Sequence, residues 1–146
     1  MIFPIVIAIL FLDQASKFLF TKFLQLNHPV AVIKGVFYLT LVHNRGAAFG
    51  ILKGKLFLFI LASLIALVVI YLNLKDKGKD NPFLFKFALG LILAGGLGNL
   101  IDRIFFGYVI DFLDFRVWPV FNLADSAITV GAILLGWSIC TRKSAV

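Results

Sequence analysis

The sequence predicts a mainly α-helical, polytopic membrane protein with four transmembrane helices and a small β-sheet between the first two. Of its 146 residues, 62% are apolar and only 14% are charged, whereas about a quarter of a soluble domain is charged. Such a chain has too few polar residues to cover a water-soluble core. The apolar residues also lie in long runs, and these runs predict the individual helices.

Four segments are long enough to cross a membrane, because a hydrocarbon core of about 30 Å requires about 20 apolar residues in a helix. We expect one membrane-embedded domain over residues 1–146, with spans at about 2–24, 56–74, 83–103 and 120–141. The first span is interrupted by the polar sequence LDQASK (12–17). It lacks a basic leader and a small-residue cleavage site, so we interpret it as a retained helix and not as a cleaved signal peptide.

The segment between the first two spans, about 26–55, has a different character. Its part AVIKGVFYLTLVHN (31–44) is rich in β-branched and aromatic residues, with a glycine at the expected turn. This pattern predicts a short antiparallel sheet on the membrane surface. The later segment 104–119 is partly apolar, and we expect Trp118 and Pro119 to lie at the depth of the membrane interface.

The net charge is +7, from 14 Lys and Arg against 7 acidic residues. The basic residues lie between apolar segments and form no continuous stripe, so membrane lipid is the expected partner and nucleic acid is not. With four spans, six basic residues lie on the side of residues 75–82 and the C-terminal tail, and seven lie on the opposite side of the membrane. The positive-inside rule therefore gives only a weak preference for residues 75–82 and the C-terminal tail as cytoplasmic.

All seven acidic residues are aspartates, and five of them lie within or beside apolar segments. A charge at mid-bilayer costs at least about 2.5–3.5 kcal/mol, so each of these aspartates is a candidate functional residue. In the first span, Asp13 and Lys17 are one helical turn apart. A local ion pair accounts for them equally well.

The sequence GGLGNLIDR (95–103) ends the third span. Asn99 shares a helix face with Asp102 and Arg103, which follow three and four residues later. Gly95, one turn earlier, allows close approach of another helix. The purely structural alternative is a polar clasp, in which Asp102 pairs with Arg103 and Asn99 joins two helices.

The sequence FNLADS (121–126) opens the fourth span. Asn122 and Asp125 have the spacing of a helix N-cap and its reciprocal partner, a structural device that needs no catalytic role. Between the two motifs lies VIDFLDF (109–115), which we interpret as a loop carrying Asp111 and Asp114. A solvated loop acid needs no functional explanation, but an acid between apolar residues at a membrane surface is a candidate.

Carboxylates gathered at one membrane face favour aspartyl chemistry, because two adjacent carboxyls do not both ionise and can divide the roles of acid and base. The alternatives have fewer suitable residues. His28 and His43 lack metal-ligand spacing, so we expect neither metal nor cofactor. Ser126 has no lysine nearby in sequence, and Ser16 points away from Lys17. The single cysteine, Cys140, is expected to be inert.

Two other classes remain open at this point. A small proton-coupled transporter also has four spans and intramembrane acids, but it predicts acids near mid-membrane that are accessible from both sides. An assembly factor without activity explains neither the two Asn-x-x-Asp sequences nor their common depth.

Five sequences, taken together, resemble the lipoprotein signal peptidase (signal peptidase II) family in order and spacing: LDQASK (12–17), NRGAAFG (44–50), GGLGNLIDR (95–103), VIDF (109–112) and FNLADS (121–126). They extend over most of the chain. The resemblance implies an aspartyl endopeptidase of the bacterial inner membrane. Such an enzyme removes signal peptides from prolipoproteins by cleaving just before the diacylglyceryl-modified cysteine.

The resemblance also implies a site and an orientation. It places the catalytic dyad on Asp111 and Asp125, a choice that spacing alone leaves open to Asp102 and Asp114. The expected supporting or substrate-binding residues are Asp13, Lys17, Asn44, Gly46, Asn99, Asp102, Arg103, Asn122 and Ala124. The termini and residues 75–82 would be cytoplasmic, and the sheet would be an extracytoplasmic cradle. We expect a monomer that requires no cofactor.

Overall fold

The computed structural model describes residues 2–46 and 83–143, together with residues 57, 60, 61, 64 and 68. Within these residues, three helices are long and apolar enough to cross a membrane: α1 (Ile2–Phe23), α3 (Phe83–Phe106) and α4 (Leu123–Lys143). Their large apolar side chains are exposed to the surroundings, as expected for lipid-facing helices. The predicted span 56–74 lies almost entirely outside the described residues.

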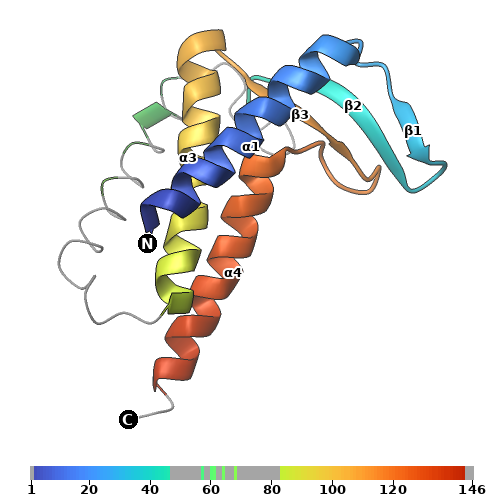
Figure 1. Ribbon diagram of the computed structural model, residues 1–146. Coiled ribbons are helices and arrows are strands. Elements are labelled where there is room, and N and C mark those ends of the chain that lie inside the picture. The colour runs from blue at the N-terminus through green and yellow to red at the C-terminus, as the bar shows by residue number, and fades with distance from the viewer. Residues whose placement is uncertain are drawn as a thin grey trace.

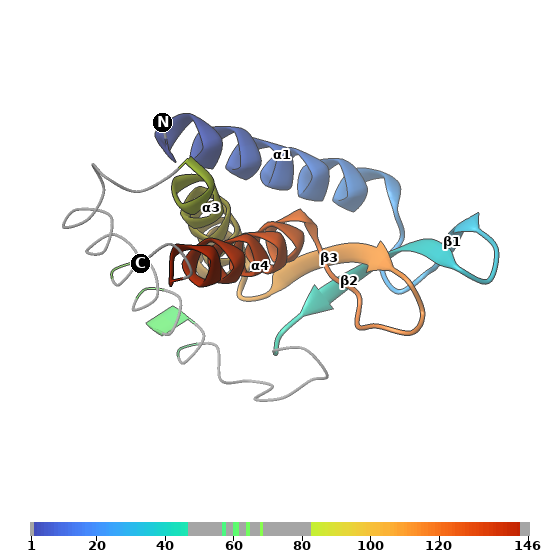
Figure 2. The same cartoon turned by 90° about the horizontal axis from the view of Figure 1, so that it is seen from below.

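The helix α3 is the centre of the bundle, with α1 crossing it on one side and α4 packed along the other (Figures 1 and 2). Glycines allow the close approach of α3 and α4. A Cβ atom at Gly95 would collide with the carbonyl oxygen of Ala124, and one at Gly131 would lie 2.8 Å from that of Ala88. The helix contact predicted at Gly95 is therefore confirmed.

A three-stranded antiparallel sheet extends sideways from the end of the bundle at which α1 ends and α4 begins (Figure 1). Its strands are β1 (Val30–Ile33), β2 (Phe37–Asn44) and β3 (Val109–Asp114), with β2 in the centre. The turn between β1 and β2 contains Gly35 with φ of +84°, a conformation that favours glycine. The hairpin predicted from residues 31–44 is confirmed.

The third strand corrects the prediction of a loop at 109–115. Strand β3 pairs with β2, so that Asp111 lies opposite Val42 and Asp114 opposite Tyr38. Four of its six residues are apolar, and all but Leu113 are buried. The loop interpretation was wrong because the partner strand is about 70 residues away in sequence, and no local pattern marks that pairing.

The start of the fourth span agrees with the cap expected at Asn122. Helix α4 begins at Leu123, a few residues after the approximate limit of 120 given to the span. Phe121 instead continues the sheet, since its backbone exchanges hydrogen bonds with Leu113 at 2.8 and 3.0 Å. This short extension brings the first turn of α4 directly against strand β3.

Candidate active site

A buried ion cluster joins α1 to α3. The Nζ atom of Lys17 lies 2.8 Å from carboxylate oxygens of both Asp13 and Asp102, and all three side chains are 2% exposed or less. Gln14 donates hydrogen bonds to both of these carboxylates, at 3.1 Å each. The pairing of Asp13 with Lys17 predicted from their spacing is confirmed, but it belongs to a larger network.

The structural alternative in which Asp102 pairs with Arg103 is wrong, because the ion pair of Asp102 is with Lys17 on another helix. Consecutive residues on a helix point about 100° apart, so these two side chains face different neighbours. Asp102 also accepts a hydrogen bond from the backbone N–H of Ile110 at 3.0 Å. It thereby ties the end of α3 to strand β3.

The first turn of α4 has the predicted cap. The Asn122 side chain accepts the backbone N–H of Asp125 at 2.9 Å, and Asp125 accepts that of Asn122 at 3.4 Å. This reciprocal arrangement satisfies N–H groups that have no partner within the helix. Asp13 adds a third contact by accepting the N–H of Ala124 at 2.9 Å, where a carboxylate also interacts favourably with the helix dipole.

The cap residues Asn122 and Asp125 also lie beside a second carboxyl, that of Asp111. Three asparagines donate hydrogen bonds to these two carboxyls. Asn122 Nδ2 donates to Asp111 Oδ1 at 2.7 Å, and Asn44 Nδ2 donates to Asp111 Oδ2 at 2.9 Å. Asn99 Nδ2 donates to Asp125 Oδ1 at 2.7 Å. Every carboxylate oxygen of this pair therefore accepts an N–H group: Asn122 supplies two of the donors, and Asn44 and Asn99 supply one each.

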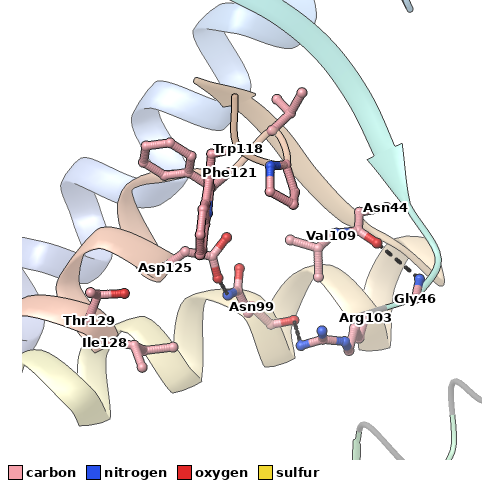
Figure 3. A pocket seen from close by; sticks show the side chains of 12 residues that line it. Asn44, Gly46, Asn99, Arg103, Val109, Trp118, Phe121, Asp125, Ile128 and Thr129 are labelled. Atoms are coloured by element: carbon pink, nitrogen blue, oxygen red, sulfur yellow. Dashed lines mark hydrogen bonds between the residues drawn. The ribbon is translucent and has the colours of Figure 1, made fainter. Parts of the chain in front are cut away.

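A pocket of about 360 Å³ opens beside Asp125 (Figure 3). Asn44, Asn99, Arg103 and Gly46 supply polar and backbone surface on one side, while Trp118 and Phe121 form an apolar wall. A second, largely apolar pocket of about 470 Å³ shares Trp118, Phe121 and Asp125 with the first. Asp125 is thus half-buried and reachable, whereas Asp111 is 1% exposed and lines neither pocket.

The electrostatics of Asp111 follow from this placement. Burial, reinforced by the negative charge of Asp125, raises its pKa from 3.8 to about 7. The amide hydrogen bonds from Asn44 and Asn122 oppose this shift. A carboxyl with a pKa near neutrality can give or take a proton at physiological pH.

All the site residues expected from the sequence converge on this end of the helices, although they play different parts. Asn44, Gly46, Asn99, Arg103 and Asp125 line the pocket. Asp13, Lys17, Asp102, Asn122 and Ala124 form the buried support through the contacts given above.

Asp114 requires a correction. It is 5% exposed and is not the solvated loop acid of the alternative interpretation. It accepts a hydrogen bond from Thr40 at 2.6 Å and from the backbone N–H of Arg116 at 2.9 Å. Asp114 therefore fastens β3 to β2 and shapes the turn that leads to Trp118.

Sequence reasoning missed several residues of the site. Gln14 lies within LDQASK (12–17), so its polarity in an apolar helix was a usable signal. Phe121 also lines the pocket, and its place in FNLADS (121–126) was a usable signal. Thr129 and Ile128 line the pocket too, but their types are ordinary for a membrane helix, and nothing in the sequence distinguishes them. Within residues 2–46 and 83–143, no group of three or more His, Cys, Asp or Glu side chains could hold a metal ion.

The fold and the site together define a polytopic membrane protein with an asparagine-bound pair of carboxyls at one end of its helices, one of which, Asp125, lines a pocket. The family model described as "Signal peptidase (SPase) II" matches residues 5–141. This chain therefore belongs to the signal peptidase II family, and so is a peptidase that is embedded in the bacterial inner membrane by several helices.

Curated relatives and solved structures agree with that assignment. The chain is 46% identical over 138 residues to the lipoprotein signal peptidase of Halothermothrix orenii, covering 92% of each chain. It is 48% identical to that of Caldanaerobacter subterraneus subsp. tengcongensis, covering 91% of each. A solved structure described as a bacterial membrane enzyme has a TM-score of 0.92 at 31% identity, covering 99% of this chain and 90% of that one.

Proposed function

We propose that this protein is an aspartyl endopeptidase that removes signal peptides from prolipoproteins, cleaving just before the diacylglyceryl-modified cysteine. The observation that carries the proposal is the pair Asp111 and Asp125, held by asparagine amides beside a pocket. Membership of the signal peptidase II family supports both the reaction and the substrate class.

In the proposed reaction the two carboxyls divide the roles of base and acid. Asp125 faces the pocket and takes a proton from the water whose oxygen attacks the scissile carbonyl carbon. Asp111, with its raised pKa, gives its proton to the carbonyl oxygen. The tetrahedral intermediate then collapses as its C–N bond breaks and the proton held by Asp125 passes to the leaving amine nitrogen. Asp111 takes back a proton from one hydroxyl of the intermediate, so that a carboxylic acid and an amine leave and the dyad returns to its starting state.

The surroundings of the dyad suit a substrate that is itself part membrane helix and part lipid. Trp118 and Phe121 line both pockets, and both pockets reach Asp125. An apolar cavity next to the reacting carboxyl can accept aliphatic groups of the substrate, because their burial is favourable by about 25 cal/mol per Å². This juxtaposition supports recognition of a lipid-modified residue at the scissile bond.

We further propose the orientation that the resemblance implies, together with a monomeric assembly. The whole of residues 1–146 acts as one membrane-embedded peptidase domain. In addition to α1, α3 and α4 it has a further span at about 56–74, which is the second in chain order. The termini and residues 75–82 face the cytoplasm, and the sheet and the dyad lie at the extracytoplasmic face. The protein acts as a monomer in membrane lipid.

The direct test compares two substrates that differ only in lipidation. Purified protein in detergent should cleave a diacylglyceryl-modified prolipoprotein, with the new N-terminus at the modified cysteine, and should leave the unmodified precursor intact. The Asp125→Asn variant, purified in the same way, controls for contaminating peptidases. Equal cleavage of both substrates by the wild-type protein would contradict recognition of the lipid, and cleavage by the variant would contradict the dyad.

A further inference from the structure

The ammonium group of Lys17 is fully coordinated by side chains from two helices. It lies 2.8 Å from Asp13, 2.8 Å from Asp102 and 3.1 Å from the amide oxygen of Asn99. A lysine ammonium has three N–H donors, so each donor has one acceptor. Two of these acceptors are carboxylates that balance its charge, but the third is a neutral amide that contacts the dyad.

The amide of Asn99 therefore has one determined orientation. Its oxygen accepts from Lys17 and, at 3.0 Å, from Asn122 Nδ2, which occupies both lone pairs of an amide oxygen. Its Nδ2 atom is consequently directed to Asp125 Oδ1, 2.7 Å away (Figure 3). A flipped amide would place its NH₂ against the lysine cation and its oxygen against the Asp125 carboxylate, which is unfavourable at both ends.

We propose that Lys17 is a positioning residue of the peptidase, which locks the Asn99 amide so that its N–H holds the Asp125 carboxylate in the pocket. The inference rests on the proposed function, because it assigns to Lys17 a role in the turnover of that dyad. Lys17 does not touch the pocket, since the residues that line it include Asn99 but not Lys17. Its effect should therefore fall on kcat and not on substrate binding.

The alternative is that Lys17 only neutralises two buried carboxylates and stabilises the fold. The single substitution Lys17→Met does not separate the two roles, because it leaves Asp13 and Asp102 buried without their cation, which is strongly destabilising. The double substitution Asp13→Asn with Lys17→Met does separate them. It removes one positive and one negative charge, so the cluster keeps its net charge, and the asparagine can still accept the N–H of Ala124.

The experiment measures kcat and KM for the lipidated precursor, per mole of folded protein, in the wild type, Lys17→Met and the double variant. We expect the double variant to regain thermal stability relative to Lys17→Met while its kcat stays about 100-fold below wild type, the scale of loss for a misplaced catalytic group. KM should change little. Lys22→Met is the matched control, since Lys22 is exposed on the same helix, and it should retain wild-type kcat.

Two results would be decisive against the proposal. A double variant with restored stability and wild-type kcat would reduce Lys17 to a structural role, as would a loss confined to KM. Failure of the proposed function has a different signature: the wild type would leave the lipidated precursor uncut, or Asp125→Asn would cleave it, whatever the result at Lys17.

Discussion

Asp111 and Asp125 are two identical side chains in different surroundings. Asp125 is half-buried at the start of a helix and reaches two pockets, while Asp111 lies in a strand and is almost completely buried. Environment, and not residue type, sets the behaviour of paired carboxyls. Substitution and pH can both test the roles that these surroundings give to the two aspartates.

We expect Asp111→Asn and Asp125→Asn each to abolish turnover of the lipidated precursor. Asparagine keeps the shape of the side chain but cannot transfer a proton as a carboxyl does. Because residues that act as a unit give non-additive losses, the double variant should be scarcely worse than either single one. Substantial turnover by a correctly inserted single variant would show that the dyad is misassigned, with Asp102 the next residue to test.

We expect kcat to be highest below pH 7 and to fall as the pH rises through about 7, where Asp111 loses the proton that it must supply. Its folded pKa lies above the unfolded value of 3.8. The stability linked to this proton is therefore fully present below 3.8 and is lost as the pH rises towards 7. A pH–rate profile at saturating substrate tests the activity part, and a flat profile from pH 6 to 9 would contradict it.

Strand β3 and the first turn of α4 are the two elements that carry the carboxyls of the site and place them side by side. β3 carries Asp111 and pairs with β2, which brings Asn44 to it. Phe121 extends the sheet and places the cap of α4 beside the strand. Helix α4 in turn approaches α3 closely enough for Asn99 to reach Asp125, and glycines permit that approach.

The α3–α4 contact can be tested by substitution of its glycines. Gly95→Ala should lower both the folded yield and the thermal stability, because the added Cβ would collide with the backbone oxygen of Ala124, which cannot move aside cheaply. Gly136→Ala is the matched control in α4, since its Cβ would enter open space, and it should be neutral or slightly stabilising because alanine favours the helix. Thermal unfolding in detergent measures both, and equal stability of the two variants would contradict the packing argument.

For the molecule as a whole, the site lies at one end of the bundle, where the sheet meets the helices (Figure 1). The acidic side chains of the site gather there and are not spread along the helices. This arrangement favours the peptidase over the proton-coupled transporter, which would need acids accessible from both sides.

The proposed orientation predicts a labelling pattern in intact cells. Single cysteines placed in 26–46, in a background without Cys140, should react with an impermeant thiol reagent. Single cysteines placed in 75–82 should react only after the cells are permeabilised. The opposite pattern would put the dyad on the cytoplasmic side, where exported precursors are not processed.

Local sequence determined much of this protein. The apolar runs predicted α1, α3 and α4, Gly35 marked the hairpin, Gly95 marked the helix contact, and the spacing of Asn122 and Asp125 predicted the cap. These features depend on residues a few positions apart, whose relative geometry is set by the helix or the turn itself. The resemblance identified from five short sequences led to the correct family.

Only the tertiary structure decided which distant residues meet. Asp102 pairs with Lys17 and not with Arg103, Asp114 is buried against Thr40, and residues 109–114 are a strand because β2 lies beside them. The sequence contains several N–H donors of similar chemistry with which each carboxylate could pair. Which donor it binds depends on the crossing of helices and the register of strands, and these are set by the packing of the whole molecule.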